Sequence, residues 1–341
     1  MSVVGTFLVR SGILNSVHTF ANDPSRGLFI LSFLALMVFS SIFIFFRYAP
    51  EDNKNYKIFS KESFILANNW FMIFFLAVVL IGTLYPVFLD TLTGQKISVG
   101  PPYYNFILAP FLIPLLFLMT SGPNHKWISS DIKGIFNITL FISVIIFSII
   151  FFVIEEISLL LFLILLFSIY LIIQTIFDFY ETFKNKNINL SRIISHFGFG
   201  LLILSISLNQ IFSVEKSFNA KLGDEKIFQN YIIKFNNLET FSKNNFKSVK
   251  GQFEVIDTKK TRSQFLSPEI RVYNQPETIT YEASINTRLF SDTYLTMSNI
   301  SNSDIFNIKF QKKPFMNFIW FSVLLVSLGG IFQFLRFRTK T

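Results

Sequence analysis

The class of fold is decided by the stretch Gly27-Leu-Phe-Ile-Leu-Ser-Phe-Leu-Ala-Leu-Met-Val-Phe-Ser-Ser-Ile-Phe-Ile-Phe-Phe-Arg47. It holds about 20 nearly uninterrupted apolar residues, the length that a helix needs to cross the hydrocarbon core of a bilayer. Arg47 and the following Pro50 close the run, as helix stop signals do. A shorter and more polar segment precedes it, and that segment contains His18. The chain therefore opens with a histidine next to a predicted membrane span.

The composition extends this interpretation to the whole chain. Of 341 residues, 51% are hydrophobic and 18% aromatic, more apolar surface than one soluble core can bury. There is no cysteine, which excludes disulfides, thiolate metal sites and a thiol nucleophile. The net charge of +9 is better explained by membrane topology than by nucleic-acid binding.

Seven apolar runs are long enough, or nearly so, to span a membrane. They cover residues 27–47, 69–89, 104–121, 134–153, 157–178, 193–213 and 315–335. The third contains Pro110 and Pro114, which neighbouring helices can accommodate. Glu155 and Glu156 predict a tight turn between the fourth and fifth runs, because such charges are costly inside a bilayer. The predicted fold class is mainly α, a polytopic membrane helix bundle with a small external β-rich domain.

The distribution of lysine and arginine predicts the orientation of the bundle. If residues 1–26 lie outside, the inside segments carry twelve of these residues and the short outside segments carry three. The twelve are Arg47, Lys54, Lys57, Lys61, Lys126, Lys133, Lys184, Lys186, Arg192, Arg336, Arg338 and Lys340. The three are Arg10, Arg26 and Lys96. This orientation also places residues 214–314 outside.

Residues 214–314 differ in composition from the rest, being polar and rich in Asn and Lys. Tyr231–Phe235 and Gln252–Ile256 alternate between apolar and polar residues, as half-buried strands do. No metal-ligand spacing, glycine-rich phosphate loop or catalytic triad is present in this stretch, which favours a cover or docking surface over a catalytic domain. We predict four parts: an external segment over 1–26, a six-helix membrane domain over 27–213, this domain over 214–314, and a last helix with an inside tail over 315–341.

Three histidines are the candidates for iron ligation or proton transfer. His196 lies in an apolar run about 6 Å beyond Arg192, where an unpartnered imidazole is expensive. Gly200 and Ser207 follow on nearly the same helix face, so a flat macrocycle or another helix can approach closely. A hydrogen bond from His196 to a neighbouring helix stays an alternative. For His18 a loop histidine is the simpler interpretation from the residues alone, and His125, beside Lys126, is predicted to be solvated.

Several motifs resemble one protein family. They are Gly5-Thr-Phe-Leu-Val-Arg-Ser-Gly-Ile-Leu-Asn-Ser-Val-His-Thr-Phe-Ala-Asn-Asp-Pro24, Gly82-Thr-Leu-Tyr-Pro86, Ile97-Ser-Val-Gly-Pro-Pro-Tyr103, Ser121-Gly-Pro123, Ser195-His-Phe-Gly198 and Ser267-Pro-Glu-Ile-Arg271. Over nearly the whole chain this set resembles the CcmF/NrfE family of cytochrome c-type biogenesis proteins, the haem lyases. The resemblance implies a polytopic protein that receives haem from a haem chaperone and joins the vinyl groups to the cysteines of apocytochrome c.

The resemblance also implies roles for single residues. His18 matches an external histidine that ligates the incoming haem where it is attached. His196 matches a transmembrane axial ligand of a stably bound haem b. Because haem carries two propionates and arginine binds carboxylates through a bidentate fork, we hypothesise that one or both of Arg10 and Arg26 bind them near His18. Anchoring to lipid headgroups is the alternative for both arginines, and the loop Ile97–Tyr103 is expected to wall the same site.

One part of the family architecture is missing. The tryptophan-rich WWD segment has no counterpart, because Trp70, Trp127 and Trp320 are far apart. We therefore expect the C-terminal half of a lyase, either a split subunit or a fragment, with a WWD-bearing N-terminal half as a partner. The resemblance further implies apocytochrome c and its thiol-reducing or holding subunits as partners, in a bacterial inner membrane or a mitochondrial one. A cofactor-free assembly scaffold and a secondary transporter stay as alternatives.

Overall fold

The structure is a computed structural model, and it describes eleven stretches of the chain. These are residues 2–10, 24–49, 57–95, 97–128, 138–151, 157–185, 189–243, 245–259, 262–274, 277–299 and 304–338. The chain divides into two compact units, residues 1–136 and 137–341.

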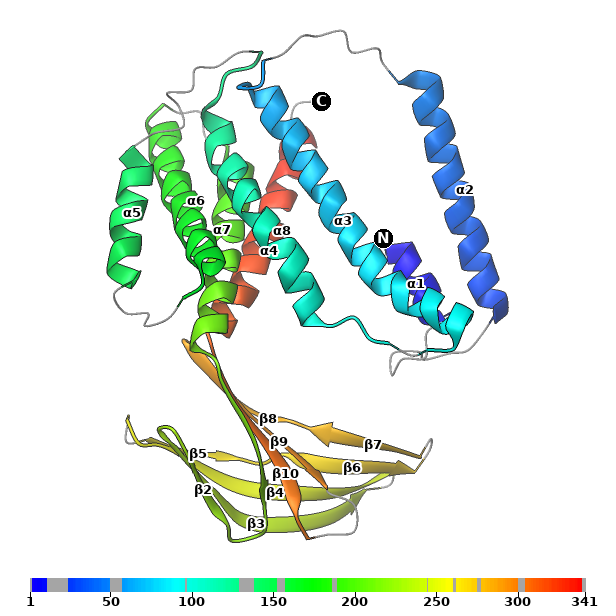
Figure 1. Ribbon diagram of the computed structural model, residues 1–341, viewed down its shortest axis with the longest axis vertical. Coiled ribbons are helices and arrows are strands. Elements are labelled where there is room, and N and C mark those ends of the chain that lie inside the picture. Colours follow the sequence, from blue (N-terminus) through cyan, green and yellow to red (C-terminus); the bar gives the residue numbers. More distant parts are fainter. Residues whose placement is uncertain are drawn as a thin grey trace. The chain divides into compact units, whose positions relative to one another are not determined.

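The first unit is helical (Figure 1). Its elements are α1 (Ser2–Arg10), α2 (Pro24–Tyr48), α3 (Lys61–Thr93), α4 (Pro101–Ser121) and the short 3-10 helix η1 (Gly122–Asn124). The side chain of Ser60 caps α3 by accepting a hydrogen bond from the backbone N–H of Ser63, and Gly94 ends α3 in the left-handed conformation. Pro101 starts α4, where its fixed φ suits the first helical position.

Two segments that the charge rule assigns to the same side of the membrane meet in this unit. The backbone N–H of Lys57 donates to the carbonyl of Ile128 over 2.9 Å, and that of Lys61 donates to Lys126 over 3.0 Å. The N–H of Ile128 donates in turn to the carboxylate of Glu62 over 2.8 Å. The start of α3 and the segment after α4 are thus joined at one end of a helix pair.

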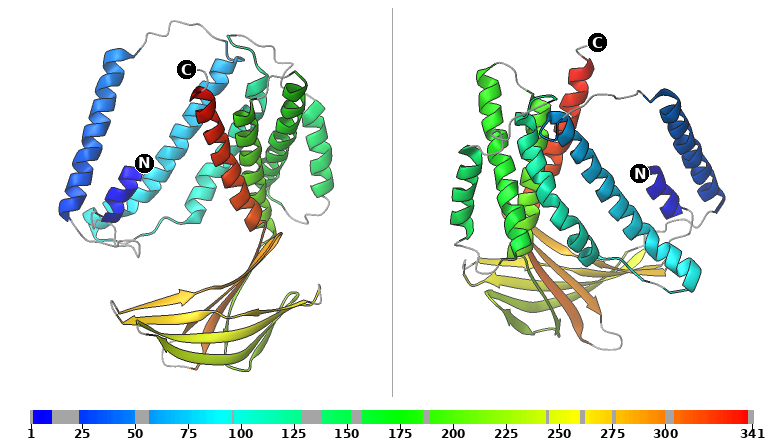
Figure 2. Two further views of the ribbon diagram at one scale, coloured as in Figure 1. Left: turned by 180° about the vertical axis from the view of Figure 1, so that it is seen from behind. Right: turned by 45° about the horizontal axis from the view of Figure 1, so that its top comes forward.

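The second unit combines helices with a β-sandwich (Figure 1). The helices are α5 (Ile138–Phe151), α6 (Leu159–Lys184), α7 (Leu190–Phe212) and α8 (Met316–Arg338). Helices α7 and α8 lie side by side although the whole sandwich separates them in sequence (Figure 2). Ser191 near the start of α7 donates a 2.7 Å hydrogen bond to the carbonyl of Gly329 in α8.

Ten strands are found in the described part of this unit, and they form two antiparallel sheets. They are β1 (Val214–Ala220), β2 (Glu225–Phe228), β3 (Tyr231–Lys243), β4 (Phe246–Asp257), β5 (Arg262–Leu266), β6 (Glu269–Asn274), β7 (Glu277–Glu282), β8 (Ser284–Arg288), β9 (Ser291–Asn299) and β10 (Phe306–Pro314). One sheet has the order β1-β10-β9-β8, and the other has β2-β3-β4-β6-β7 with β5 on β4. Alternate residues such as Ile233, Phe253 and Phe310 point into a buried core between the sheets.

The predicted fold class is confirmed. Six described helices are long and apolar enough to cross a membrane, and α5 is a shorter apolar helix in the fourth predicted run. The two predicted strands lie within β3 and β4. The proposed turn at Glu155 and Glu156 falls outside the described residues.

Two local features were not predicted. Residues Ser2–Arg10, within the predicted external segment, form the helix α1. The expected loop Ile97–Tyr103 is shorter than predicted, because Pro101 and Pro102 begin α4, three residues earlier than the predicted span.

Candidate functional site

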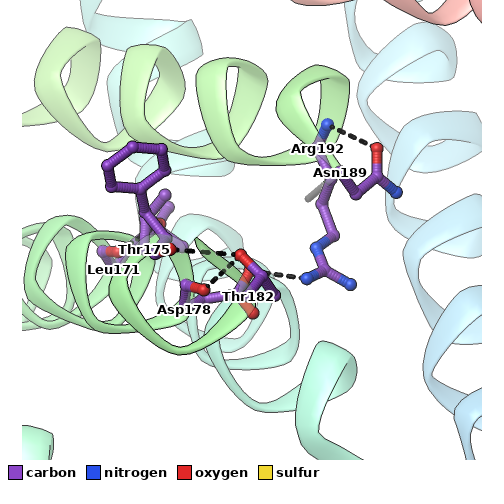
Figure 3. Close-up of polar contacts among 7 residues, drawn as sticks. Leu171, Thr175, Asp178, Thr182, Asn189 and Arg192 are labelled. Carbon is purple, nitrogen blue, oxygen red and sulfur yellow. Dashed lines mark hydrogen bonds and ion pairs between the residues drawn. The ribbon is translucent and has the colours of Figure 1, made fainter. Parts of the chain in front are cut away.

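His196 lies in the second turn of α7, on the side that faces α6. One turn before it, the guanidinium of Arg192 makes a 2.6 Å ion pair with the carboxylate of Asp178 in α6 (Figure 3). One turn after it, Gly200 packs against α6, where a Cβ would lie 2.9 Å from Cγ1 of Ile172. The imidazole is half-buried between these two contacts.

The start of α7 is fixed by a cap and by the ion pair. The side chain of Asn189 accepts a 3.4 Å hydrogen bond from the backbone N–H of Arg192 (Figure 3). On α6, the hydroxyl of Thr182 donates to the carbonyl of Asp178 over 2.7 Å. Both partners of the ion pair are partly shielded from solvent, with 27% and 18% of their side chains exposed. The polar cluster thereby holds the ends of α6 and α7 together next to His196.

Small residues let α7 approach two helices closely. A Cβ at Gly198 would lie 2.9 Å from Cβ of Leu325 and 3.1 Å from the carbonyl of Ser322, both in α8. The Gly200 face is occupied by α6. The sequence left open whether a flat macrocycle or another helix approaches Gly200. In the described structure a helix, α6, packs there.

The imidazole of His196 has no hydrogen-bond partner among the described residues. The alternative role for His196, a hydrogen bond to a neighbouring helix, thus finds no partner in the parts of the chain that the structure covers. A half-buried neutral imidazole retains one ring nitrogen with a lone pair, which is the atom that ligates iron. This leaves His196 chemically suited to the predicted ligand role.

The other predicted site residues are not assembled into a site by the described structure. His18 lies outside the described residues. Arg10 is the last residue of α1, and its side chain is not among those described. Arg26 is exposed in the first turn of α2. Their proposed joint role in holding haem stays a prediction.

His125 differs from its prediction. Its side chain is only 3% exposed, so the expectation of a solvated histidine was wrong. The ring packs edge-on against Phe64, with 4.5 Å between centroids. Within the described part of the chain, neither of its nitrogens nor the buried hydroxyl of Ser121 has a hydrogen-bond partner. Burial and the nearby Lys61 ammonium lower the pKa of His125 below its ordinary value.

Two of the sequence motifs that carry the family resemblance meet in the first unit. A Cβ at Gly82 would lie 2.7 Å from the hydroxyl of Tyr104 and 2.9 Å from the ring of Tyr103. The side chains of Tyr103 and Tyr104, which follow Pro101 and Pro102, therefore pack against Gly82, where a larger residue would not fit. Sequence reasoning named both motifs without predicting their contact, since their separation along the chain gives no signal for it.

These features define a polytopic membrane protein with a β-sandwich inserted between its last two described helices, and with a half-buried histidine where α6 meets α7. A family model described as the CcmF C-terminal beta-sandwich matches residues 211–314. The chain is 30% identical to the cytochrome c-type biogenesis protein CcmF of Pseudomonas aeruginosa, covering 100% of this chain and 54% of that protein. For CcmF of Escherichia coli the identity is 28%, covering 97% and 53%. For NrfE of Haemophilus influenzae it is 25%, covering 99% and 55%.

A solved structure titled Cytochrome c Heme Lyase CcmF has the same fold. Its TM-score is 0.66 at 16% identity, with 92% of this chain and 51% of that chain covered. The predicted resemblance to the CcmF/NrfE family is thereby confirmed. The chain spans about half the length of the curated relatives that it matches.

Proposed function

We propose that this chain acts in cytochrome c maturation, as one half of a haem lyase that attaches haem to apocytochrome c. The observation that carries the proposal is the similarity over the full length of the chain to proteins named for cytochrome c biogenesis. The matched relatives are about twice as long, so the activity is proposed for this chain together with an N-terminal half that bears the WWD segment.

The residues around His196 fit a haem group as a donor of one axial ligand. The imidazole is half-buried and has no hydrogen-bond partner among the described residues, and the Arg192–Asp178 ion pair joins its helix α7 to α6. Of the three histidines in the sequence, His196 alone lies in a predicted membrane span. We therefore propose that the N-terminal half supplies the second ligand of a stably bound haem b.

A second group of residues is proposed to handle haem as the substrate. His18 binds the iron of the incoming haem, and Arg10 and Arg26 bind its propionates through charge-assisted hydrogen bonds. Haem supplies the reactive vinyl groups, so the protein's task is to position haem and apocytochrome c against one another. Residues 1–26 thus form the external haem-site segment of the proposed lyase.

The partners follow from the same proposal. A haem chaperone delivers haem outside the membrane, and apocytochrome c arrives with its thiol-reducing or holding subunits. The sandwich of residues 214–314 is proposed to lie on that outer side as a cover or docking surface. The proposed location is the bacterial inner membrane, or the inner membrane of mitochondria.

The test replaces His18 in a strain that depends on this chain for cytochrome c. His18→Ala is expected to abolish covalent haem on the cytochrome, because the incoming iron loses its ligand. Thr19→Ala, one residue further on, is the matched control and should keep the wild-type yield. Haem-stained cytochrome c is measured at equal levels of the membrane protein. A wild-type yield from His18→Ala would remove this histidine from the reaction.

A further inference from the structure

The turn between β8 and β9 has an unusual composition. Arg288 pairs with Ser291, so the two residues Leu289 and Phe290 form the whole connection. Two-residue hairpin turns favour Asn, Gly and Asp. These residues tolerate the backbone angles of such turns, and the side chains of Asn and Asp are polar and face water. Here both positions are large and apolar, and both are exposed, by 66% for Leu289 and 62% for Phe290. Turn geometry does not explain this choice.

The apolar turn is fixed to the beginning of α8. The backbone N–H of Phe315 donates to the carbonyl of Phe290 over 2.9 Å. The side-chain amide of Asn317 donates to the carbonyl of Arg288 over 2.8 Å, and the rings of Phe290 and Phe318 stack with 5.7 Å between centroids. These contacts set the depth of the turn relative to α8.

Helix α8 shows what surrounds the turn. It is one of the helices that can cross a membrane, over Met316–Leu335. Its first turns expose Trp320 by 63% and Phe321 by 51%, and aromatic side chains of this kind gather where hydrocarbon meets the headgroups. At 1.5 Å per residue, Trp320 lies only about 6 Å along the helix from Met316. A turn fixed to Phe315, Asn317 and Phe318 is therefore at the same interfacial level.

We propose that the Leu289–Phe290 turn inserts into the membrane interface and anchors the sandwich to lipid. The two apolar side chains would enter the boundary between headgroups and acyl chains, and the exposed Arg288 beside them would contact lipid phosphates. The bilayer is preferred as the occupant over a partner protein. The turn is tied to the first turn of a helix that can cross a membrane, and the exposed aromatic residues Trp320 and Phe321 of that helix are of the kind that gathers at the lipid interface.

The anchor would fix the orientation of the sandwich on the membrane. The side-chain amide of Asn209, near the end of α7, donates to the carbonyl of Pro314 over 2.5 Å, so the two chain crossings between membrane and sandwich lie together. Two adjacent crossings join the sandwich to the helices at one place. The apolar turn would add a second attachment to the membrane, which would restrain tilting of the sandwich.

The chain has no cysteine, so single-cysteine variants can be labelled cleanly. The full chain with Leu289→Cys carries an environment-sensitive fluorophore and is reconstituted in vesicles of phosphatidylethanolamine and phosphatidylglycerol. The matched control is Leu222→Cys, another exposed leucine in a turn, located past the end of β1 that is remote from α7. Equal thermal unfolding of both labelled proteins shows that the fold is kept.

A quencher attached to the lipid chains should quench the probe at residue 289, and its depth should be about 5–10 Å below the headgroup surface. The probe at residue 222 should respond only to a water-soluble quencher. Adding Arg288→Gln to the residue-289 probe should reduce quenching in vesicles with phosphatidylglycerol. Equal responses at the two positions would overturn the proposal. So would shielding at residue 289 that occurs in native membranes but not in pure lipid, because that result identifies a partner protein as the occupant.

Discussion

Among single residues, His196 carries the proposed cofactor assignment. In the protein purified with its N-terminal half, His196→Gly is expected to abolish the low-spin haem b spectrum, because the iron loses an axial ligand and glycine offers no replacement. His18→Ala should leave that spectrum unchanged, since the proposal gives it a different haem. Reduced-minus-oxidised absorbance spectra at equal protein concentration make the comparison. The same loss of spectrum from both substitutions would mean that the two-site proposal is wrong.

His125 makes a prediction about pH at the same scale. Its pKa is lowered by burial first and by the Lys61 ammonium second, so the folded protein favours the neutral ring. The stabilisation is complete above the unfolded pKa of about 6.5 and is lost as the pH falls through the folded pKa. We expect the wild type to lose more stability than His125→Leu between about pH 8 and about pH 5. Thermal unfolding in detergent at the two pH values measures the difference.

The same substitution has an expected sign at neutral pH. Leucine removes two buried nitrogens that have no hydrogen-bond partner among the described residues. His125→Leu should therefore stabilise the protein by about 1 kcal/mol, the lower end of the cost of a buried unsatisfied group. A loss of stability at neutral pH would show that the ring has a polar partner, such as a bound water molecule.

At the scale of helices, the close contact of α7 with α8 depends on Gly329 and not on its neighbour Gly330. A Cβ at Gly329 would clash with Oγ of Ser195 and lie 3.0 Å from the carbonyl of Ser191, whereas at Gly330 it would meet nothing within 4 Å. Gly329→Ala should cost about 1–3 kcal/mol by overpacking. Gly330→Ala, its matched control, should be neutral or stabilise by up to about 1 kcal/mol, because alanine favours helix. Thermal unfolding of the two variants distinguishes them, and equal melting temperatures would contradict the close packing.

The elements also show what a sequence can predict. Apolar runs predicted the long helices, and alternation over Tyr231–Phe235 predicted part of β3, because both patterns are local. Helix α1 was missed because its nine residues are too short to register as a span. The burial of His125 was missed because it depends on contact with Phe64 in α3, which is distant in sequence. The adjacent Lys126 suggested exposure to solvent. The contact of Ser191 with Gly329 joins residues 138 apart, and no local pattern encodes it.

For the whole molecule, a candidate site can be predicted only where this chain provides all of its parts. The sequence singled out His196 because it lies in an apolar run. The structure adds that its helix packs against α6 and that the Arg192–Asp178 ion pair lies one turn away. The pairing of His196 with a second ligand is a different matter. His18 is predicted outside the membrane, and His125 follows η1, beyond the end of the candidate span Pro101–Ser121. The proposed second ligand of haem b is therefore expected from another polypeptide segment.

This leads to a prediction about expression of the chain by itself. In the proposal the chain supplies one of the two iron ligands, so by itself it should purify with weakly bound haem or none. Co-expression with a WWD-bearing N-terminal half should give a stable low-spin haem. The bis-histidine form needs an imidazole on each side of the iron, so occupancy should rise with the second half and not with added haem. The measurement is the haem-to-protein ratio and the reduced spectrum of both preparations. His196→Gly with the N-terminal half is the control for haem held elsewhere. A full-occupancy bis-histidine spectrum from the chain alone would place both ligands within these 341 residues, and the division of the site between two halves would then be wrong.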